Sequence, residues 1–322
     1  MTDQQTRLAL TPLPTAIQPA PRLAQAIGLR PDDLWIKRDD LTGMGGGGNK
    51  LRKLEYTVGR AREEGANVLV TTGAPQSNHA RLTAAVAANL GMRAILVFPG
   101  EPGRSHSGNL VLDRLFGAQI DWAGDVTPQE LAAYADDVVM RLKAEGARPA
   151  LIPFGGSSAL GAQGYAVCAA EILDQVPEVQ HVVTAVGSGG TMAGLVAGLG
   201  VEKVLGVDVG ARPDAAEAIT SFASPLIGTA VDPTALRICD QVGAGYSTYT
   251  TEAEAALVLT ARTEGLILDP IYTSRAMAGL IAAVRGGTIQ PGHPTVFLHT
   301  GGLPGLFGHS DAVARAEALI CE

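Results

Sequence analysis

The sequence predicts an α/β protein whose sheets are mostly parallel. Short apolar runs, such as Val68-Leu69-Val70 and Ala94-Ile95-Leu96-Val97, alternate with alanine-rich stretches of helical length along the whole chain. Continuous apolar runs are typical of strands that are buried on both faces, as in parallel sheets. Several of the helical stretches end at a glycine, which is common at helix C-termini: Gly65, Gly91, Gly146 and Gly265.

The expected elements follow one another in a regular α/β order. Strands are expected at 34–37, 68–72, 94–98, 150–153, 181–186, 204–209 and 295–299. Helices are expected at about 50–64, 77–91, 104–116, 128–146, 160–175, 190–199, 252–264 and 273–285. The chain of 322 residues has room for two packed domains or one large one. In such sheets ligands bind where the carboxyl ends of strands meet helix N-termini.

Composition and charge exclude several classes of function. Apolar residues make up 46% of the chain, and 24 basic against 32 acidic side chains give a net charge of −8. An acidic balance argues against nucleic acid or an anionic membrane as the main partner. Cys168, Cys239 and Cys321 are far apart, with no metal-binding spacing and no disulfide framework. Without a hydrophobic signal core or an apolar run of spanning length, the chain is expected in the cytoplasm.

A glycine-rich stretch at 45–55 brings one lysine, Lys50, to the start of a predicted helix. Glycine allows close backbone approach because it has no Cβ, and the pKa of a crowded lysine shifts readily. Taken alone, this stretch is more typical of a flexible loop with a surface lysine. Two further loops, at 71–81 and 186–191, favour a ligand site because both resemble sites for anionic groups.

The first of these anion sites is Gly187-Ser188-Gly189-Gly190-Thr191, which follows a predicted strand and precedes a predicted helix. Consecutive backbone N–H groups at a helix N-terminus form a cup for phosphate, and two hydroxyls add donors. The alternatives are a tight turn without a ligand and half of a dinucleotide-binding fold. Asp208 stands about 20 residues further on, as that fold requires, but Met192 occupies the third glycine position. Five small residues and two hydroxyls favour the phosphate cup.

Other polar residues stand at predicted strand ends. Gln76-Ser77-Asn78-His79 supplies an N-cap for the following helix and more donors than capping needs, which suits a small carboxylate. Tyr246 and Tyr272 lie in loops, where a phenol serves as an acid or donor, or packs as an ordinary aromatic ring. His299-Thr300-Gly301-Gly302 closes the last predicted strand with a hydroxyl and two glycines. This set fits pyridoxal 5′-phosphate (PLP), which needs a Schiff-base lysine, a phosphate site and a partner for its pyridine nitrogen.

Together these residues resemble the D-cysteine desulfhydrase and 1-aminocyclopropane-1-carboxylate (ACC) deaminase family of tryptophan-synthase-β-like, fold type II PLP enzymes. The resemblance runs from about Pro12 to Leu306. It rests on Lys37-Arg38-Asp39-Asp40, Gly47-Gly48-Asn49-Lys50 with Arg52-Lys53-Leu54-Glu55, Gln76-Ser77-Asn78-His79, Gly187-Ser188-Gly189-Gly190-Thr191 and His299-Thr300-Gly301-Gly302. Ala74-Pro75 and Leu51 depart from the usual family residues, and Pro75 removes a donor beside the expected carboxylate site.

The resemblance implies a role for each motif. Lys50 binds the cofactor and moves the Cα proton, Gly187 to Thr191 bind the phosphate, and Asn78 binds the ring hydroxyl. Ser77 and neighbouring N–H groups receive the substrate carboxylate, while Tyr246 and Tyr272 match the two tyrosines of the family's active site. The other expected substrate-binding residues are Gln76, Asn78, His79 and Thr273. The fold implied is a homodimer of two-domain, three-layer αβα subunits. A small domain at 49–155 is inserted into a large PLP-binding domain formed by 1–48 and 156–322.

Three positions favour β-elimination over ACC ring opening. ACC deaminases carry Glu after the second tyrosine, Leu in the final His-Leu-Gly-Gly motif and Gln where this chain has His79; here the first two positions are Thr273 and Thr300. A carboxylate would keep the pyridine nitrogen protonated and strengthen the electron sink, whereas a threonine hydroxyl donates to a neutral nitrogen. The weaker sink is sufficient when a good leaving group departs from Cβ.

The sequence therefore predicts a lyase that converts D-cysteine to pyruvate, ammonia and sulfide. The alternatives are elimination from L-cysteate or β-chloroalanine, and ACC deamination. A nucleotide-dependent oxidoreductase that uses the Gly187 loop is the alternative from another class of enzyme.

Overall fold

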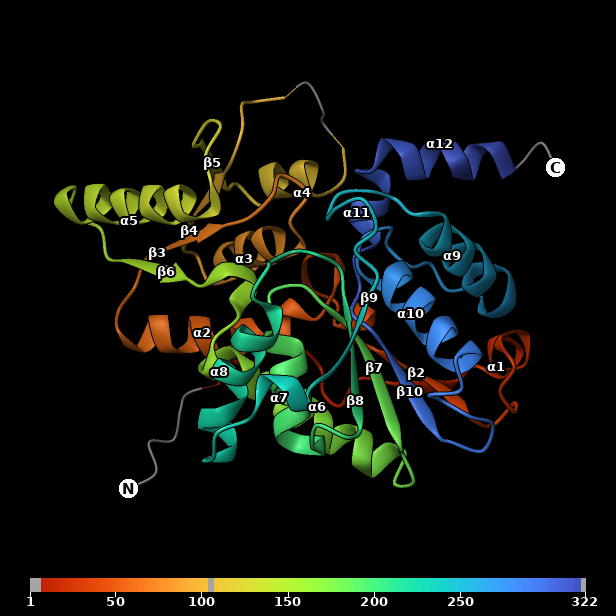
Figure 1. Cartoon of the computed structure of the whole chain (residues 1–322). Coiled ribbons are helices and arrows are strands. Elements are labelled where there is room, and N and C mark those ends of the chain that lie inside the picture. The colour runs from red at the N-terminus through yellow and green to blue at the C-terminus, as the bar shows by residue number, and fades with distance from the viewer. Residues whose placement is uncertain (1–6, 104–106, 320–322) are drawn as a thin grey trace.

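The computed structural model describes residues 7–103 and 107–319, which form two separate β-sheets (Figure 1). The six-stranded sheet has the order β1 (Ile17–Pro19), β2 (Leu34–Arg38), β10 (Thr295–His299), β7 (His181–Val186), β8 (Val204–Asp208), β9 (Arg237–Asp240). The four-stranded sheet has the order β5 (Gln119–Trp122), β4 (Arg93–Phe98), β3 (Val68–Thr72), β6 (Pro149–Ile152). The pair β1–β2 is antiparallel, and the other described pairs are parallel, as the sequence predicts.

Helices cover both faces of the six-stranded sheet, so alternate residues of its strands enter two different cores. In β7, Val183 packs into the core beneath one set of helices, whereas Val182 packs on the opposite face. The first set is α1 (Pro21–Ile27), α9 (Thr251–Glu264) and α10 (Thr273–Arg285). The second set is α6 (Ala159–Gln175), α7 (Gly190–Leu199) and α8 (Ala215–Ile227). Burial on both faces explains the continuous apolar runs of these strands.

The four-stranded sheet is also covered on both faces (Figure 1). Leu69 of β3 faces one core, and Val68 and Val70 face the other. The first core lies beneath α2 (Lys50–Glu63), α3 (Asn78–Asn89) and α4 (Asn109–Leu115), and the second lies beneath α5 (Pro128–Ala144). Two short C-terminal helices, α11 (Leu303–Phe307) and α12 (Ser310–Ala318), follow the last strand.

Most of the expected elements occur within two residues of their predicted bounds, and the differences lie mainly at the periphery. β1, β5 and β9 were not predicted, and each is an edge strand of three or four residues without a continuous apolar run. The helices α1, α8, α11 and α12 were also not predicted. The helix expected at 104–116 is the shorter α4, and residues 104–106 lie outside the described part of the chain.

Helix α2, which begins at Lys50, packs closely against α6, and α6 packs closely against α7. A Cβ at Gly164 of α6 would lie 2.2 Å from the backbone oxygen of Arg52, and one at Gly194 of α7 would lie 2.1 Å from that of Ala162. Glycine is therefore required at both positions, because a methyl group would separate the helices.

A buried cluster of ion pairs joins α2 to the six-stranded sheet and to α6. Arg52 donates to Asp39 through Nε at 2.8 Å and Nη2 at 2.9 Å, and to the two carboxylate oxygens of Glu171 at 2.8 Å each. Lys37 of β2 donates to Glu171 at 2.7 Å, and the Tyr165 hydroxyl donates to Asp39 at 2.5 Å. The cluster therefore pairs two cationic side chains with two carboxylates, and all four side chains are buried or nearly so: Arg52, Lys37, Asp39 and Glu171.

Within residues 7–103 and 107–319, no helix combines the length and apolar character needed to cross a membrane. The same residues contain no cluster of three or more His, Cys, Asp or Glu side chains suited to a metal ion. Cys168 and Cys239 are free thiols.

We predict that Arg52→Met destabilises the protein far more than Arg60→Met, although both arginines are ion-paired residues of α2. Loss of Arg52 leaves buried Asp39 without its main partner and is expected to cost about 3–5 kcal/mol of unfolding free energy. Arg60 pairs with Glu64 on the surface, so its loss is expected to cost at most about 1 kcal/mol. Urea unfolding of both variants measures the difference, and equal costs would contradict a central role for the buried cluster.

Candidate active site

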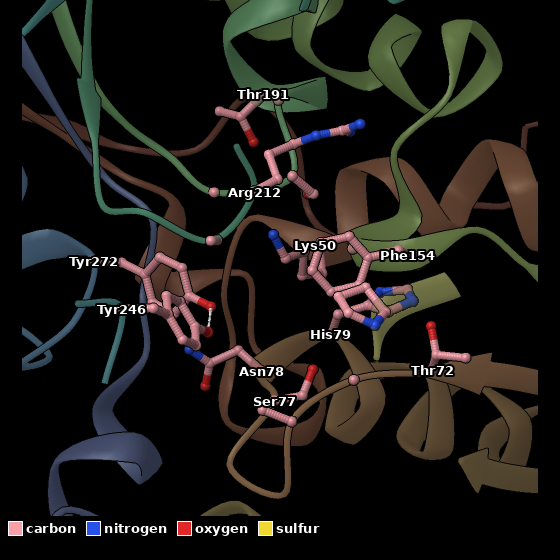
Figure 2. A pocket seen from close by; sticks show the side chains of 18 of the residues that line it. Lys50, Thr72, Ser77, Asn78, His79, Phe154, Thr191, Arg212, Tyr246 and Tyr272 are labelled. Atoms are coloured by element: carbon pink, nitrogen blue, oxygen red, sulfur yellow. Dashed lines mark hydrogen bonds between the residues drawn. The ribbon is translucent and has the colours of Figure 1, made fainter. Parts of the chain in front are cut away.

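A cavity of about 660 Å³ lies where carboxyl ends of strands from both sheets face each other (Figure 2). Its walls are loops that follow these strands. Thr72 is the last residue of β3 and Gly73 follows it, and Phe154 comes after β6 of the four-stranded sheet. Gly187 follows β7 and Thr300 follows β10 of the six-stranded sheet. A parallel sheet binds ligands at this edge, as the sequence predicts.

Lys50 enters the cavity at the first turn of α2 because two glycine-containing loops approach its backbone. A Cβ at Gly47, where φ is +71°, would lie 2.1 Å from the backbone oxygen of Asp40. A Cβ at Gly301, where φ is +86°, would lie 2.8 Å from the Cα of Gly48. The backbone N–H of Asn49 donates to the Thr300 carbonyl at 3.0 Å, which fixes Lys50 beside the end of β10. The predicted role of glycine next to Lys50 is thus supported by geometry.

Burial changes the protonation of the side chains around Lys50. It lowers the pKa of Lys50 to about 8, against the opposing effect of the Asp269 carboxylate. Burial also holds the pKa of Lys53, one turn along α2, well below its usual value, and neighbouring Lys50 adds to this effect. His79 has a pKa well below its usual range because it is buried near both lysines. The Lys50 amine is therefore available as a base and nucleophile near neutral pH.

The Gly187–Thr191 loop forms a cradle of hydrogen-bond donors at the start of α7. Ser157 lies beneath it: its Oγ accepts from the Gly190 N–H at 3.2 Å and lies 2.7 Å from Ser188 Oγ. Lys53 Nζ donates to the same Ser157 oxygen at 3.0 Å, which places a potential cation at the cradle. Because a Cβ at Gly190 would lie 2.6 Å from Ser157 Oγ, the cradle needs glycine there. This arrangement is suited to a phosphate group.

In the loop at 76–79, three residues line the cavity and one has a structural role. Ser77 is the N-cap of α3 and accepts from the Ala80 N–H at 3.1 Å; with Asn78 and His79 it lines the cavity. Gln76 is not among the lining residues. Its side chain accepts from the Asn109 N–H at 2.8 Å and donates to the Ser107 carbonyl at 3.1 Å. The substrate contact predicted for the Gln76 side chain is thus not supported by this geometry, because the amide links α3 to α4.

His79 has a defined tautomer because of the hydroxyl beside it. Thr71 Oγ1 donates its proton to the Ile152 carbonyl at 2.9 Å and lies 2.9 Å from His79 Nε2. A hydroxyl has one proton, so His79 Nε2 carries a hydrogen and donates it to Thr71. Because burial and the two lysines hold the pKa of His79 well below its usual range, the ring is neutral with its hydrogen on Nε2, and it is held by Thr71 of β3. Its predicted contact with the substrate remains a prediction.

Tyr246 and Tyr272 come together from distant parts of the chain, and their hydroxyls share a hydrogen bond (Figure 2). The ring centroids are 5.9 Å apart in an edge-to-face arrangement. Burial raises the pKa of Tyr246 and raises that of Tyr272 well above its usual value, so both are protonated donors. Arg275 of α10 fixes the Tyr246 loop by donating to the Gly245 and Val209 carbonyls at 2.8 Å each.

The two threonines predicted to face the pyridine nitrogen have different environments. Thr300 lines the cavity, whereas Thr273 is fully buried and is not among the lining residues. Thr273 Oγ1 accepts from the Asp269 N–H and donates to Asp269 Oδ1, both at 2.7 Å. Its single proton is already committed, so donation from Thr273 to a ligand would require this pair to break. The geometry favours Thr300 for that role.

Several cavity residues were not identified from the sequence. Lys53 lies three residues after Lys50, a spacing that places both on one helix face and could have indicated the pair. Phe154 lines the wall opposite the tyrosines, and Arg212 lies near Thr191 (Figure 2). Asp208, which suggested a dinucleotide, is not a lining residue; its carboxylate accepts from the Gly210 N–H at 2.8 Å. Nothing at this carboxylate supports a ribose site.

A partly buried lysine with a lowered pKa, facing a phosphate cradle between two α/β layers, defines the class of a PLP-dependent enzyme. Comparison with known families agrees: the model of the family described as "Pyridoxal-phosphate dependent enzyme" matches residues 8–301. The chain belongs to this family. The sequence-based identification of the cofactor and of fold type II is thereby confirmed.

Individual relatives extend over nearly the whole chain. A D-cysteine desulfhydrase of Salmonella typhi is 40% identical over 321 residues, covering 94% of this chain and 96% of that protein. A crystal structure of an ACC deaminase homologue superposes with a TM-score of 0.87 at 37% identity, covering 97% of this chain and 96% of that one. Threonine deaminase isoform 2 of Solanum lycopersicum, with a TM-score of 0.65 and 19% identity over 89% and 79% of the two chains, shares the fold.

The cavity residues fit PLP in both shape and chemistry. Glycine at 190 keeps the cradle open, and N–H groups, hydroxyls and Lys53 supply the donors that a phosphate needs. Lys50 is the amine that would bond the aldehyde, and its lowered pKa favours the neutral form that reacts. Asn78, Tyr272 and Thr300 border the remaining space as hydrogen-bonding groups.

We predict that covalent attachment of PLP to the apoprotein depends on pH with a midpoint near 8. Only the neutral Lys50 amine reacts, so the rate is expected to rise about tenfold per pH unit below the midpoint and to level off above it. Stopped-flow absorbance measures this rate, and Lys50→Ala provides the control without attachment. A rate that still rises steeply above pH 10 would indicate an ordinary exposed amine instead.

Proposed function

We propose that this PLP-dependent enzyme is a β-eliminating carbon–sulfur lyase that acts on D-cysteine. The observation that carries the proposal is the polar wall of the cavity beside Lys50, at the end of β10 and the start of α10. There Thr300 lines the cavity, while the carboxylate of Asp269 accepts hydrogen bonds from the N–H groups of Ile271, Tyr272 and Thr273 and from the Thr273 hydroxyl. A hydroxyl suits a neutral pyridine nitrogen, which is sufficient for elimination of a good leaving group. The 40% identity to a D-cysteine desulfhydrase supports the same substrate.

PLP supplies an electron sink that stabilises negative charge at the substrate Cα. The chain supplies the positioning. The Gly187–Thr191 cradle with Lys53 holds the phosphate, and the Ser77 hydroxyl with the N–H groups at the start of α3 holds the substrate carboxylate. With a pKa of about 8, Lys50 takes the proton from Cα. Burial of both the lysine and the substrate limits exchange of that proton with solvent.

The tyrosine pair is placed to assist the leaving group. Tyr272 keeps its proton because burial raises its pKa well above the usual value, and Tyr246 is hydrogen-bonded to it. We assign proton donation to the departing sulfur to Tyr272, with Tyr246 positioning the phenol. The overall reaction consumes D-cysteine and water and releases pyruvate, ammonia and hydrogen sulfide, with no change in the total number of electrons.

ACC deaminase is the second candidate, because the solved ACC deaminase homologue covers nearly the whole chain. The hydroxyl of Thr300 argues against it, since ring opening of a substrate without a Cα hydrogen needs a stronger electron sink. L-Cysteate and β-chloroalanine remain alternative substrates of the elimination. These substrates differ in leaving group, and the same assay separates them.

We also propose the assembly and location of the enzyme. Residues 49–155 are proposed as a small domain inserted into a large domain formed by 1–48 and 156–322; this division is supported by the four-stranded sheet, whose strands all lie between Val68 and Ile152. A homodimer is supported by exposed apolar side chains near the loops that follow β2 and β10, including Leu41, Leu303 and Phe307. Two free thiols and the acidic composition support a cytoplasmic location without nucleic acid as a partner.

We predict that the PLP-loaded enzyme releases pyruvate and sulfide in equal amounts from D-cysteine, and that Lys50→Ala abolishes the release. Coupled assays of both products, with L-cysteine, L-cysteate, β-chloroalanine and ACC alongside, identify the leaving group and the stereochemistry. If ACC were the one substrate turned over, the proposed reaction would be ring opening instead of elimination. Turnover of no substrate by an enzyme with its PLP absorbance intact would contradict a lyase.

We predict that replacing Thr300 mainly lowers activity, whereas replacing Thr273 mainly lowers stability. Thr300→Val is expected to lower kcat/KM for D-cysteine about tenfold with little effect on stability, because a cavity donor is lost. Thr273→Val is expected to lower the unfolding free energy by about 1–3 kcal/mol, because the buried Asp269 loses its hydroxyl partner. Steady-state kinetics and urea unfolding of both variants provide the comparison. A loss of kcat/KM in Thr273→Val but not in Thr300→Val would mean that Thr273, and not Thr300, contacts the ring nitrogen.

A further inference from the structure

The amide of Asn78 has a defined orientation, which is set by two buried residues outside the cavity wall. Asn78 Oδ1 accepts from Arg81 Nη1 at 3.3 Å and from Asn109 Nδ2 at 3.0 Å. Arg81 and Asn109 are both fully buried. Asn78 itself lines the cavity between Ser77 and the tyrosine pair (Figure 2). Asn78 Oδ1 is therefore fixed by these two donors, and the amide nitrogen, Nδ2, points away from them.

This orientation follows from groups that can only donate or only accept. Arginine has no acceptor, so the atom of Asn109 that lies 3.1 Å from Arg81 Nη1 is an oxygen. The Gln76 carbonyl has no donor, so the atom of Asn109 that lies 2.7 Å from it is the amide nitrogen. With both ends of Asn109 assigned, its nitrogen donates to Asn78 and the contacting atom of Asn78 is an oxygen. The opposite orientation of Asn78 would place its NH₂ group against two donors.

Arg81 connects this arrangement to Lys50. Its Nη2 donates to the Gly47 carbonyl at 2.6 Å, in the loop that leads to Lys50. Its Nη1 contacts both Asn78 and Asn109. Burial lowers the pKa of Arg81 to about 10, and Asp113 of α4, whose own pKa burial raises to about 7, opposes that shift. One buried guanidinium thus links the glycine loop of α2, the start of α3 and the start of α4.

We propose that Arg81 and Asn109 are positioning residues that fix Asn78 as a donor, with its NH₂ group facing the ring hydroxyl oxygen of PLP. The inference rests on the proposed placement of Asn78 beside that oxygen and goes beyond it by naming the residues that set its polarity. A donor stabilises the anionic oxygen of the ring, whereas an acceptor at the same place repels it. The affinity for PLP therefore depends on a residue, Asn109, that does not line the cavity.

The test is Asn109→Asp, which changes one NH₂ group to an oxygen and keeps the shape of the side chain. One aspartate oxygen still accepts from Arg81, and the other faces both Asn78 Oδ1 and the Gln76 carbonyl oxygen and repels them. Asn78 is expected to turn its amide, donate to the aspartate and present Oδ1 to the cavity. Loss of one charge-assisted hydrogen bond and gain of a repulsive contact are expected to weaken PLP binding by about tenfold or more. Absorbance titration of the apoprotein with PLP measures the dissociation constant.

Two controls separate positioning from a general effect on the fold. Asn89→Asp makes the same chemical change at an exposed residue of α3 and is expected to leave the PLP dissociation constant unchanged. In a double-mutant cycle, Asn109→Asp is expected to have no effect on PLP binding once Asn78→Leu has removed the amide. Thermal unfolding of each apoprotein establishes that the variants are folded.

Each outcome decides the inference. Weaker PLP binding by Asn109→Asp that disappears in the Asn78→Leu background supports it. Unchanged binding by Asn109→Asp, or a loss that persists in that background, overturns it while leaving the proposed function intact. If Asn78→Leu alone leaves PLP binding unchanged, Asn78 does not contact the cofactor, and the proposed placement of that residue fails together with the inference.

Discussion

The buried pairing of Arg52 with Asp39 and Glu171 is the interaction on which the geometry of the active site depends. Arg52 lies two residues after Lys50, and two residues of an α-helix turn through about 200°. Anchoring the Arg52 side chain to the β2 end and to α6 therefore aims Lys50 at the opposite side, into the cavity. Lys53 completes nearly a full turn and lies on the same side as Lys50. Because an incomplete buried pair is strongly destabilising, the cluster holds this helix in one rotation.

Burial in the cavity that this helix faces favours the neutral forms of its titratable groups. Burial lowers the pKa of Lys50, Lys53 and His79 and raises that of both tyrosines. A phosphate in the Gly187–Thr191 cradle would reverse the shift of Lys53, because a nearby negative charge favours the ammonium form. The same phosphate influences Lys50 less, since Lys53 is the residue bonded beneath the cradle. The two lysines, three residues apart, are thereby suited to different tasks: one as counter-charge, the other as base.

Sequence patterns predicted the central strands, the main helices and the loops that carry the cavity, because each has a local signal in burial or glycine content. Edge strands such as β9 lacked that signal, since one side of an edge strand has no neighbour to bury it. Polar residues were harder to assign. Gln76 and Thr273 have the composition of a site, but their hydrogen bonds go to Asn109 and Asp269. Which polar groups the fold itself uses depends on contacts distant in sequence or on local loop geometry.

The hydrogen bonds of Thr273 also bear on which residue contacts the pyridine nitrogen, the contact proposed to favour elimination over ring opening. A glutamate at 273 would stand beside Asp269, whose carboxylate already accepts four hydrogen bonds around the start of α10. Two adjacent buried carboxylates do not both ionise, so one of them would hold a proton. An acid at 273 could therefore protonate the pyridine nitrogen only if the Asp269 loop were rearranged. Thr300 carries no such constraint, because it lines the cavity and is not bonded to Asp269. Under the proposed function, Thr300 is therefore the residue expected to influence the reaction type, rather than Thr273.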